Sequence, residues 1–319
     1  MSIVGIDVAK ATLAIVLVRA DGKRRQKTCP NTPAGHGELV RWLTRHADAP
    51  VHVGLEATGI YHDAVALALH DAGHCVSVIN PSATAAYAKS QLQRAKTDPT
   101  DAATIADYVR TQTPPAWTPA PPELRHLQAL LRRLEALHDM RTQELNRLEA
   151  TPEAGPVRAS IQATLDHLED QILALKHEIR DHFDQHPPLR AQRDLLQSIP
   201  GIGAQTAAVV LGELLDLTRF RSARQVAAFS GLVPRVTQSG TSVRGRGGLS
   251  KLGASRLRKA LYYPALTALR ANPVIRVFAA RLRAAGKPPM LIVGAVMRKL
   301  MHLAFGVLRS GRAFTPHTA

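Results

Sequence analysis

The chain has 319 residues, 45% of them hydrophobic, and a formal net charge of +16, which is enough for two domains of ordinary size. Two cysteines, Cys29 and Cys75, are too few for a disulfide framework, so the composition excludes a disulfide-stapled secreted domain and favours a reducing cytoplasm. No basic segment precedes an apolar one at the start of the chain, and we expect no signal peptide. Basic residues interrupt the apolar stretch 290–308, so we expect a core or amphipathic helix there and no membrane partner.

Residues 1–112 predict an α/β domain. Short apolar runs bounded by turn residues predict strands over 3–8, 11–19, 51–55 and 75–79, with another around 25–29. Helices are predicted over 34–46, 61–72, 82–93 and 100–110. Three successive strands followed by alternating strands and helices are typical of a mixed sheet covered by helices.

Acidic residues occupy the ends of these elements. Asp7 ends the first strand and Glu56 ends the strand over 51–55, while Asp98 and Asp101 share one face at a helix start. Four converging carboxylates would repel one another unless cations lay between them, and Mg²⁺ or Mn²⁺ prefers such oxygen ligands. These four residues are therefore the predicted metal-binding and catalytic set.

Three of these residues have a simpler structural alternative. Asp7 could be a turn residue at a strand end, Asp98 could cap a helix ahead of Pro99, and Asp101 could favour the helix dipole. Glu56 is harder to explain in this way, because it closes the apolar run VHVGLE.

The segment 113–122 contains five prolines and predicts a linker. Residues 123–186 then predict a helical coiled-coil hairpin, with a break containing Pro and Gly at 151–156. Its second helix has apolar residues in strict steps of four and three: Ile161, Leu165, Leu168, Ile172, Leu175, Ile179 and Phe183. The pattern fits a plain helical spacer and an oligomerising arm equally well.

Residues 187–319 predict a mostly helical domain that carries the positive charge. The segment 217–319 holds 19 Lys and Arg and no Asp or Glu, whereas the rest of the chain holds 22 basic and 25 acidic residues. Solvated surfaces normally mix both signs, and so concentrated a charge favours a nucleic-acid partner over a solubilising or membrane-facing surface.

Two motifs in this domain suit phosphates. Pro200, Gly201 and Gly203 separate two predicted helices, as in a helix-hairpin-helix, whose backbone N–H groups would bind a DNA phosphate; the alternative is a plain helix corner. The Gly-rich stretch 231–261 predicts a flexible loop. Its cationic side chains are Arg235, Arg244, Arg246 and Lys251. We expect these four residues, together with Gly201 and Gly203, to contact nucleic acid.

Hydroxyl groups in and after this loop are candidate nucleophiles. From composition alone, Ser239 is one of several loop serines, beside Ser242 and Ser250. Tyr262 and Tyr263 form another candidate pair, but their apolar helical context favours packing.

Together the motifs GIDVAK, LEATG and AKTDPTDA, and the later GLVPR…SG…LSK, resemble the insertion-sequence one-ten family of transposases. The resemblance implies an N-terminal RNase H-like (RuvC-like) domain whose four carboxylates work with Ser239 as nucleophile. It also implies DNA as substrate, a dimer or tetramer with sites completed between subunits, and guidance by a structured bridge RNA.

Three rival functions remain open. A metal-only nuclease of the junction-resolving kind would leave Ser239 as a turn residue. A non-catalytic DNA- or RNA-binding protein would use only the basic domain. An actin-like ATPase is disfavoured, because no Gly-rich phosphate loop follows GIDVAK.

Overall fold

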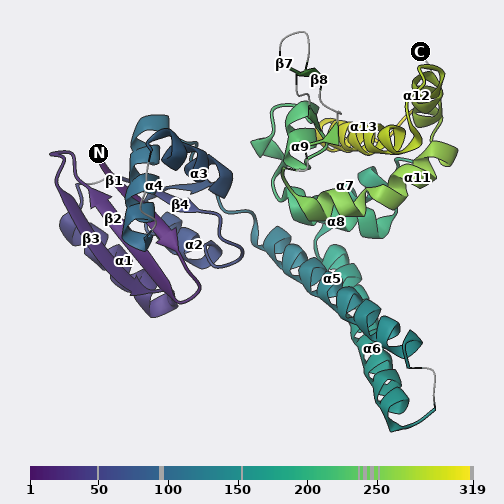
Figure 1. The fold of residues 1–319 in the computed structure, drawn as a ribbon, viewed down its shortest axis with the longest axis horizontal. Coiled ribbons are helices and arrows are strands. Elements are labelled where there is room, and N and C mark those ends of the chain that lie inside the picture. The colour runs from purple at the N-terminus through teal and green to yellow at the C-terminus, as the bar shows by residue number, and fades with distance from the viewer. Residues whose placement is uncertain are drawn as a thin grey trace. The chain divides into compact units, whose positions relative to one another are not determined.

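The computed structural model describes residues 1–48, 50–92, 97–151, 154–235, 238–239, 243–244, 248–250 and 252–316. The chain divides into two compact units, Met1–Pro119 and Ala120–Ala319 (Figure 1). The coiled-coil hairpin and the basic helical region, which the sequence separates at residue 187, lie in the same unit.

The first unit is built on a five-stranded sheet with the order β3-β2-β1-β4-β5. Its strands are β1 (Ser2–Val8), β2 (Thr12–Val18), β3 (Arg24–Pro30), β4 (Val51–Glu56) and β5 (Cys75–Ile79). The first three strands pair antiparallel, while β4 lies parallel to both β1 and β5. An antiparallel meander continued by parallel strands is the topology of an RNase H-like sheet, so the predicted fold class is confirmed.

Helices cover both faces of this sheet. They are α1 (Pro33–His46), α2 (Asp63–Asp71), α3 (Pro81–Ser90) and α4 (Asp98–Gln112). Val4, Ile6 and Val8 of β1 are buried in the core that α1 and α2 share. Ile3 packs instead with Ile105 and Val109 of α4, as the alternation of side chains along a strand requires. Every strand and helix predicted within residues 1–112 is present, with its ends shifted by at most three residues.

The Pro-rich segment covers the outer strand of the sheet. The backbone N–H of Trp117 donates to the carbonyl of Val76 at 2.6 Å, and the hydroxyl of Ser77 donates to the carbonyls of Pro114 and Pro115. Trp117 also packs against the core. The segment predicted as a linker thus belongs to the first unit as far as Pro119, and it covers an otherwise open sheet edge.

Two long helices, α5 (Pro122–Glu149) and α6 (Pro156–Gln185), begin the second unit as a hairpin (Figure 1). Leu134 and Leu137 of α5 and Leu168, Ile172 and Ile179 of α6 are buried in one cluster. The predicted heptad seam is therefore occupied within the chain itself.

Shorter helices complete this unit. They are α7 (Pro187–Gln197), α8 (Ala204–Leu214), the 3-10 turn η1 (Leu217–Arg219), α9 (Ala223–Phe229), α10 (Ser255–Ala260), α11 (Tyr262–Ala271), α12 (Pro273–Ala284) and α13 (Pro289–Ser310). By length and composition alone α13 would suit a membrane span, but 50% of its most apolar window is buried inside the structure. Val296, Leu300 and Ala304 are fully buried there, which fits the predicted core helix.

The Gly-rich stretch contains short strands as well as turns. β6 (Pro234–Arg235) pairs antiparallel with β9 (Gly248–Leu249), and β7 (Gln238–Ser239) pairs with β8 (Val243–Arg244). The sequence predicts a flexible loop here and does not indicate these strands, because strands of two residues are too short to give a periodic pattern.

Candidate active site

Asp7 is the penultimate residue of β1 and Glu56 is the last residue of β4, and these two strands are parallel neighbours. In the ladder between β1 and β4, Gly5 pairs with Gly54 and Ile6 pairs with Leu55. The next step along each strand leads to Asp7 and Glu56, so the two carboxylates lie at the same edge of the sheet. This is the arrangement that the strand-end positions predict.

Asp7 and Glu56 each lie two residues after a glycine, Gly5 and Gly54 respectively. Both glycines pack against α4. A Cβ atom on Gly5 would stand 2.1 Å from the carbonyl oxygen of Ala102 and 2.4 Å from the nitrogen of Ala106. A Cβ atom on Gly54 would stand 2.2 Å from a methyl group of Val109. Because residues two apart share a face of a strand, Asp7 and Glu56 are on the face that α4 covers.

The first turn of α4 brings two more carboxylates to this edge. Thr97 is the N-cap residue, and its side chain accepts a hydrogen bond from the N–H of Thr100. Asp98 and Asp101 follow within the first turn. The alternative that Asp98 caps the helix was therefore wrong: the helix begins one residue earlier, and Thr97 does the capping.

The electrostatics of Asp7 show that these four groups are close. The pKa of Asp7 is raised from 3.8 to about 6, first by burial and then by the negative charges of Asp98, Asp101 and Glu56, in that order of importance. The N–H of Val8 partly opposes the rise. Two separate elements, α4 and β4, thus place negative charge around the half-buried carboxyl group of Asp7.

The donor set suits a hard divalent cation, because every candidate ligand is a carboxylate oxygen. Within the part of the chain that the structure describes, no three His, Cys, Asp or Glu side chains converge on a common point. The four sequence-predicted residues therefore share one region of the sheet edge.

Glu56 is held by a residue that the sequence did not single out. The hydroxyl of Thr84, on α3, donates to Oε1 of Glu56, and Thr84 itself is only 4% exposed. This buried hydrogen bond fixes the direction of the carboxylate. Nothing in a threonine inside a predicted helix distinguishes it beforehand.

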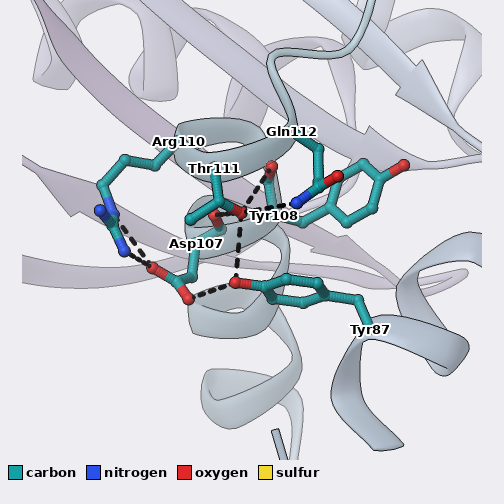
Figure 2. Close-up of polar contacts among 6 residues, drawn as sticks. All are labelled: Tyr87, Asp107, Tyr108, Arg110, Thr111 and Gln112. Atoms are coloured by element: carbon teal, nitrogen blue, oxygen red, sulfur yellow. Dashed lines mark hydrogen bonds and ion pairs between the residues drawn. The ribbon is translucent and has the colours of Figure 1, made fainter. Parts of the chain in front are cut away.

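A polar network joins α3 to α4 (Figure 2). Tyr87 of α3 donates from its hydroxyl to Asp107 at 2.7 Å, and Arg110 donates to the other oxygen of Asp107 at 3.0 Å. Burial opposes ionisation of Asp107, but these two hydrogen bonds outweigh it and keep its pKa below the usual range. The network thus connects α3, whose Thr84 donates to Glu56, to α4, which carries Asp98 and Asp101.

The loops beyond Asp7 and Glu56 are joined by Asn31. Its side-chain NH₂ donates to the carbonyl of Ala9 at 3.0 Å and to the carbonyl of Tyr61 at 3.1 Å. Its carbonyl oxygen lies 2.7 Å from Nε2 of the buried His36. Burial lowers the pKa of His36 and so favours its neutral form, and Nε2 donates here because the amide oxygen of Asn31 can only accept.

The predicted helix-hairpin-helix residues have two different roles. Gly201 has a φ of +109°, and a Cβ there would stand 2.8 Å from that of Ala268 on α11, so packing requires this glycine. Gly203 is exposed at the N-cap of α8, with no atom within 4 Å of a Cβ placed there. Only Gly203 therefore lies at an open helix N-terminus of the kind that binds phosphate.

Of the remaining predicted residues, Arg235, Ser239 and Arg244 belong to the short strands. Arg235 is exposed on β6. Ser239 pairs with Val243, and Arg244 pairs with Gln238, through the β7–β8 backbone. Arg246 and Lys251 lie outside the described residues.

Comparisons with known proteins agree with this organisation. A family model described as "Transposase" matches residues 4–151, and one described as "Transposase IS116/IS110/IS902 family" matches residues 193–280. The chain is 33% identical to the pilin gene-inverting protein of Moraxella bovis over 314 residues, which is 98% of this chain and 97% of that protein. It is 43% identical over 75 residues, 24% of this chain and 20% of that protein, to the transposase for insertion sequence element IS1111A of Coxiella burnetii.

Among solved structures, RuvC of T. thermophilus in complex with a Holliday junction substrate aligns with 37% of this chain and 99% of its own, at 19% identity and a TM-score of 0.29. The two family models lie one in each compact unit for most of their length, and the similarity to the Moraxella protein covers nearly the whole of both chains. The chain therefore belongs to the IS116/IS110/IS902 family of transposases, enzymes that cut and transfer DNA strands.

Proposed function

We propose that this transposase breaks a DNA phosphodiester bond with Ser239 as the nucleophile, and that Asp7, Glu56, Asp98 and Asp101 hold Mg²⁺ or Mn²⁺ for this step. The observation that carries the metal site is the raised pKa of Asp7, which three other carboxylates push upward. A divalent cation bound among these four carboxylates would offset their mutual repulsion.

The carboxylates supply the negative charge and the oxygen ligands of this site. A bound divalent cation would stabilise the negative charge that develops on the phosphate. Asp7 binds it only when ionised, while Thr84 keeps the Glu56 carboxylate oriented. The hydrogen bond from Tyr87 to Asp107 would limit how far α4, which carries Asp98 and Asp101, moves relative to α3.

Ser239 would perform the covalent step. Its Oγ loses a proton and bonds to phosphorus, while the bond from phosphorus to the 3′ oxygen breaks. The 3′ oxygen takes up a proton and leaves as a free hydroxyl, so the DNA strand is held as a phosphoserine. The reverse reaction with another 3′ hydroxyl rejoins the strands. Arg235, Arg244, Arg246 and Lys251 are close to Ser239 in sequence and would attract the phosphate.

The wider setting follows from the family resemblance. Similarity along the whole chain to a gene-inverting protein supports a reaction that both cuts and rejoins DNA. The C-terminal region, free of acidic residues after Asp216, would bind the DNA and a structured guide RNA. We further propose that the enzyme acts as a dimer or tetramer in the bacterial cytoplasm.

Replacing Ser239 tests the chemistry. With Mg²⁺ and a DNA carrying the element's ends, the protein should form a covalent adduct at Ser239, and Ser239→Ala should form none and leave the DNA uncut. Ser242→Ala is the matched control and should cleave normally. Full cleavage by Ser239→Ala would support the metal-only nuclease, whereas unchanged recombination by Asp7→Ala would remove the metal site from the mechanism.

A further inference from the structure

Tyr263 presents an aromatic ring to solvent at the start of α11. Its relative exposure is 75%, whereas Tyr262 packs against the core of the unit. The two rings meet edge to face, with centroids 5.4 Å apart and planes at 79°. The sequence-based interpretation that both tyrosines pack is therefore right for Tyr262 and wrong for Tyr263.

The surface around Tyr263 is a shallow hollow lined by basic side chains. The hollow has a volume of 500 Å³ and is bounded by both tyrosines together with Arg256, Arg258, Lys259 and Glu135. Glu135 accepts hydrogen bonds from Arg256 at 2.7 Å and from Lys259 at 3.2 Å. Both cations nevertheless stay accessible, with side-chain exposures of 45% and 67%. Lys259 also lies 3.6 Å from Asp139, so the three cations face two carboxylates and the hollow keeps a net positive charge.

This combination suits one kind of partner. An aromatic face beside cations binds single-stranded nucleic acid, because the ring stacks on a base while the cations contact the adjoining phosphates. A duplex hides its base faces, so the stacking partner must be unpaired.

We propose that Tyr263 stacks on an unpaired DNA base while Arg256 and Lys259 contact the phosphates on either side of it. The inference rests on the proposed strand cleavage, because cutting and exchanging strands exposes unpaired bases near the break. It adds a DNA-binding surface made of residues other than the four carboxylates and Ser239.

The test is binding of a short single-stranded DNA that contains 2-aminopurine, whose fluorescence falls when the base stacks. The full-length chain is used with a chelator, so that neither the metal site nor cleavage affects the result. Wild type and Tyr263→Phe should quench the fluorescence, because both keep the ring. Tyr263→Ala should bind about tenfold more weakly and quench little. Val277→Ala, which truncates another apolar side chain of 65% exposure, is the control and should bind like wild type.

The salt dependence of binding separates stacking from charge. Lys259→Ala should reduce the slope of log K against log salt by about 0.7, as loss of one phosphate contact on a single strand does. Tyr263→Ala should leave that slope unchanged. Equal binding by Tyr263→Ala and wild type would overturn the proposal, as would loss of quenching in Tyr263→Phe. A Tyr263 effect at least as large on duplex DNA, or on RNA of the same sequence, would overturn the choice of unpaired DNA. None of these outcomes depends on whether Ser239 is the nucleophile.

Discussion

Gly5 and Gly54 are paired partners in adjacent parallel strands, and α4 lies directly on both. Neither position has room for a Cβ atom, since the nearest atoms of α4 would stand 2.1 and 2.2 Å away. The close approach of α4 is what brings its first turn, with Asp98 and Asp101, towards Asp7 and Glu56. The geometry of the carboxylate site thus depends on two glycines that carry no chemistry themselves.

Adding a methyl group at the two glycines should have unequal effects. At Gly5 the obstructing atoms are backbone atoms of Ala102 and Ala106, which no side-chain rearrangement can remove. Gly5→Ala should lower the free energy of unfolding by about 3 kcal/mol, the upper end of ordinary overpacking costs. Both tryptophans, Trp42 and Trp117, lie in the first unit, so their fluorescence during urea unfolding measures this unit alone.

At Gly54 the nearest obstructing atom is a methyl group of Val109. Gly54→Ala should therefore be partly rescued by Val109→Ala, with a favourable coupling of about 1 kcal/mol in a double-mutant cycle. Gly5→Ala combined with Val109→Ala should show no such coupling. Wild-type stability of Gly5→Ala would show that α4 is free to move away from β1.

The raised pKa of Asp7 predicts how stability changes with pH. The folded protein binds this proton more tightly than the unfolded chain does, because the pKa is about 6 when folded and 3.8 otherwise. For this group, stability is therefore greatest below about pH 4 and falls as the pH rises from 4 to 6. In metal-free protein at pH 7.5, Asp7→Asn should raise the free energy of unfolding by on the order of 1 kcal/mol, after allowing for solvent screening.

The same carboxyl group should make metal binding depend on pH. Mg²⁺ or Mn²⁺ should stabilise the wild-type protein at pH 7.5, less so at pH 5, and Asp7→Asn much less at either pH, as measured by tryptophan fluorescence in urea. Asp71→Asn, at the end of α2, is the control and should respond to metal like wild type. Equal stabilisation of Asp7→Asn and wild type by the metal would place the cation elsewhere.

Loss of the Thr84 hydroxyl should weaken the site without changing its ligands. Thr84→Val keeps the shape of the side chain but removes the hydrogen bond to Glu56. The affinity for Mn²⁺, measured by electron paramagnetic resonance, should fall about tenfold, as is usual when a residue supporting a metal ligand is lost. Thr84→Ser keeps the hydroxyl and should restore most of the affinity. Unchanged affinity in Thr84→Val would mean that Glu56 needs no support from α3.

The sequence predicts the strands and helices of the first unit because their apolar runs are long and periodic. It also predicts correctly that Asp7 and Glu56 lie at the same edge of the sheet, because both lie at the ends of buried strands. It does not identify Thr84 or Asn31, since each reaches the site from another segment through contacts that have no local pattern. A glycine two residues before each strand-end carboxylate was a usable signal, because glycine inside a strand often marks a close approach of another backbone. The exposure of Tyr263 depends on how helices pack, which the local sequence does not contain.

Asn31 offers a last test of how the loops beside the carboxylates are held. Its side-chain NH₂ joins the loop that follows Asp7 to the loop that follows Glu56 through the carbonyls of Ala9 and Tyr61. Asn31→Asp replaces the donor with a negative oxygen that repels both carbonyls, and it should cost about 2 kcal/mol in unfolding free energy. It should also lower the affinity for Mn²⁺, because the two strand ends are no longer fixed relative to each other. Asn80→Asp is the matched control, since Asn80 caps α3 through its oxygen and aspartate caps equally well. If Asn31→Asp and Asn80→Asp bind the metal equally well, the bridge between the loops serves stability alone.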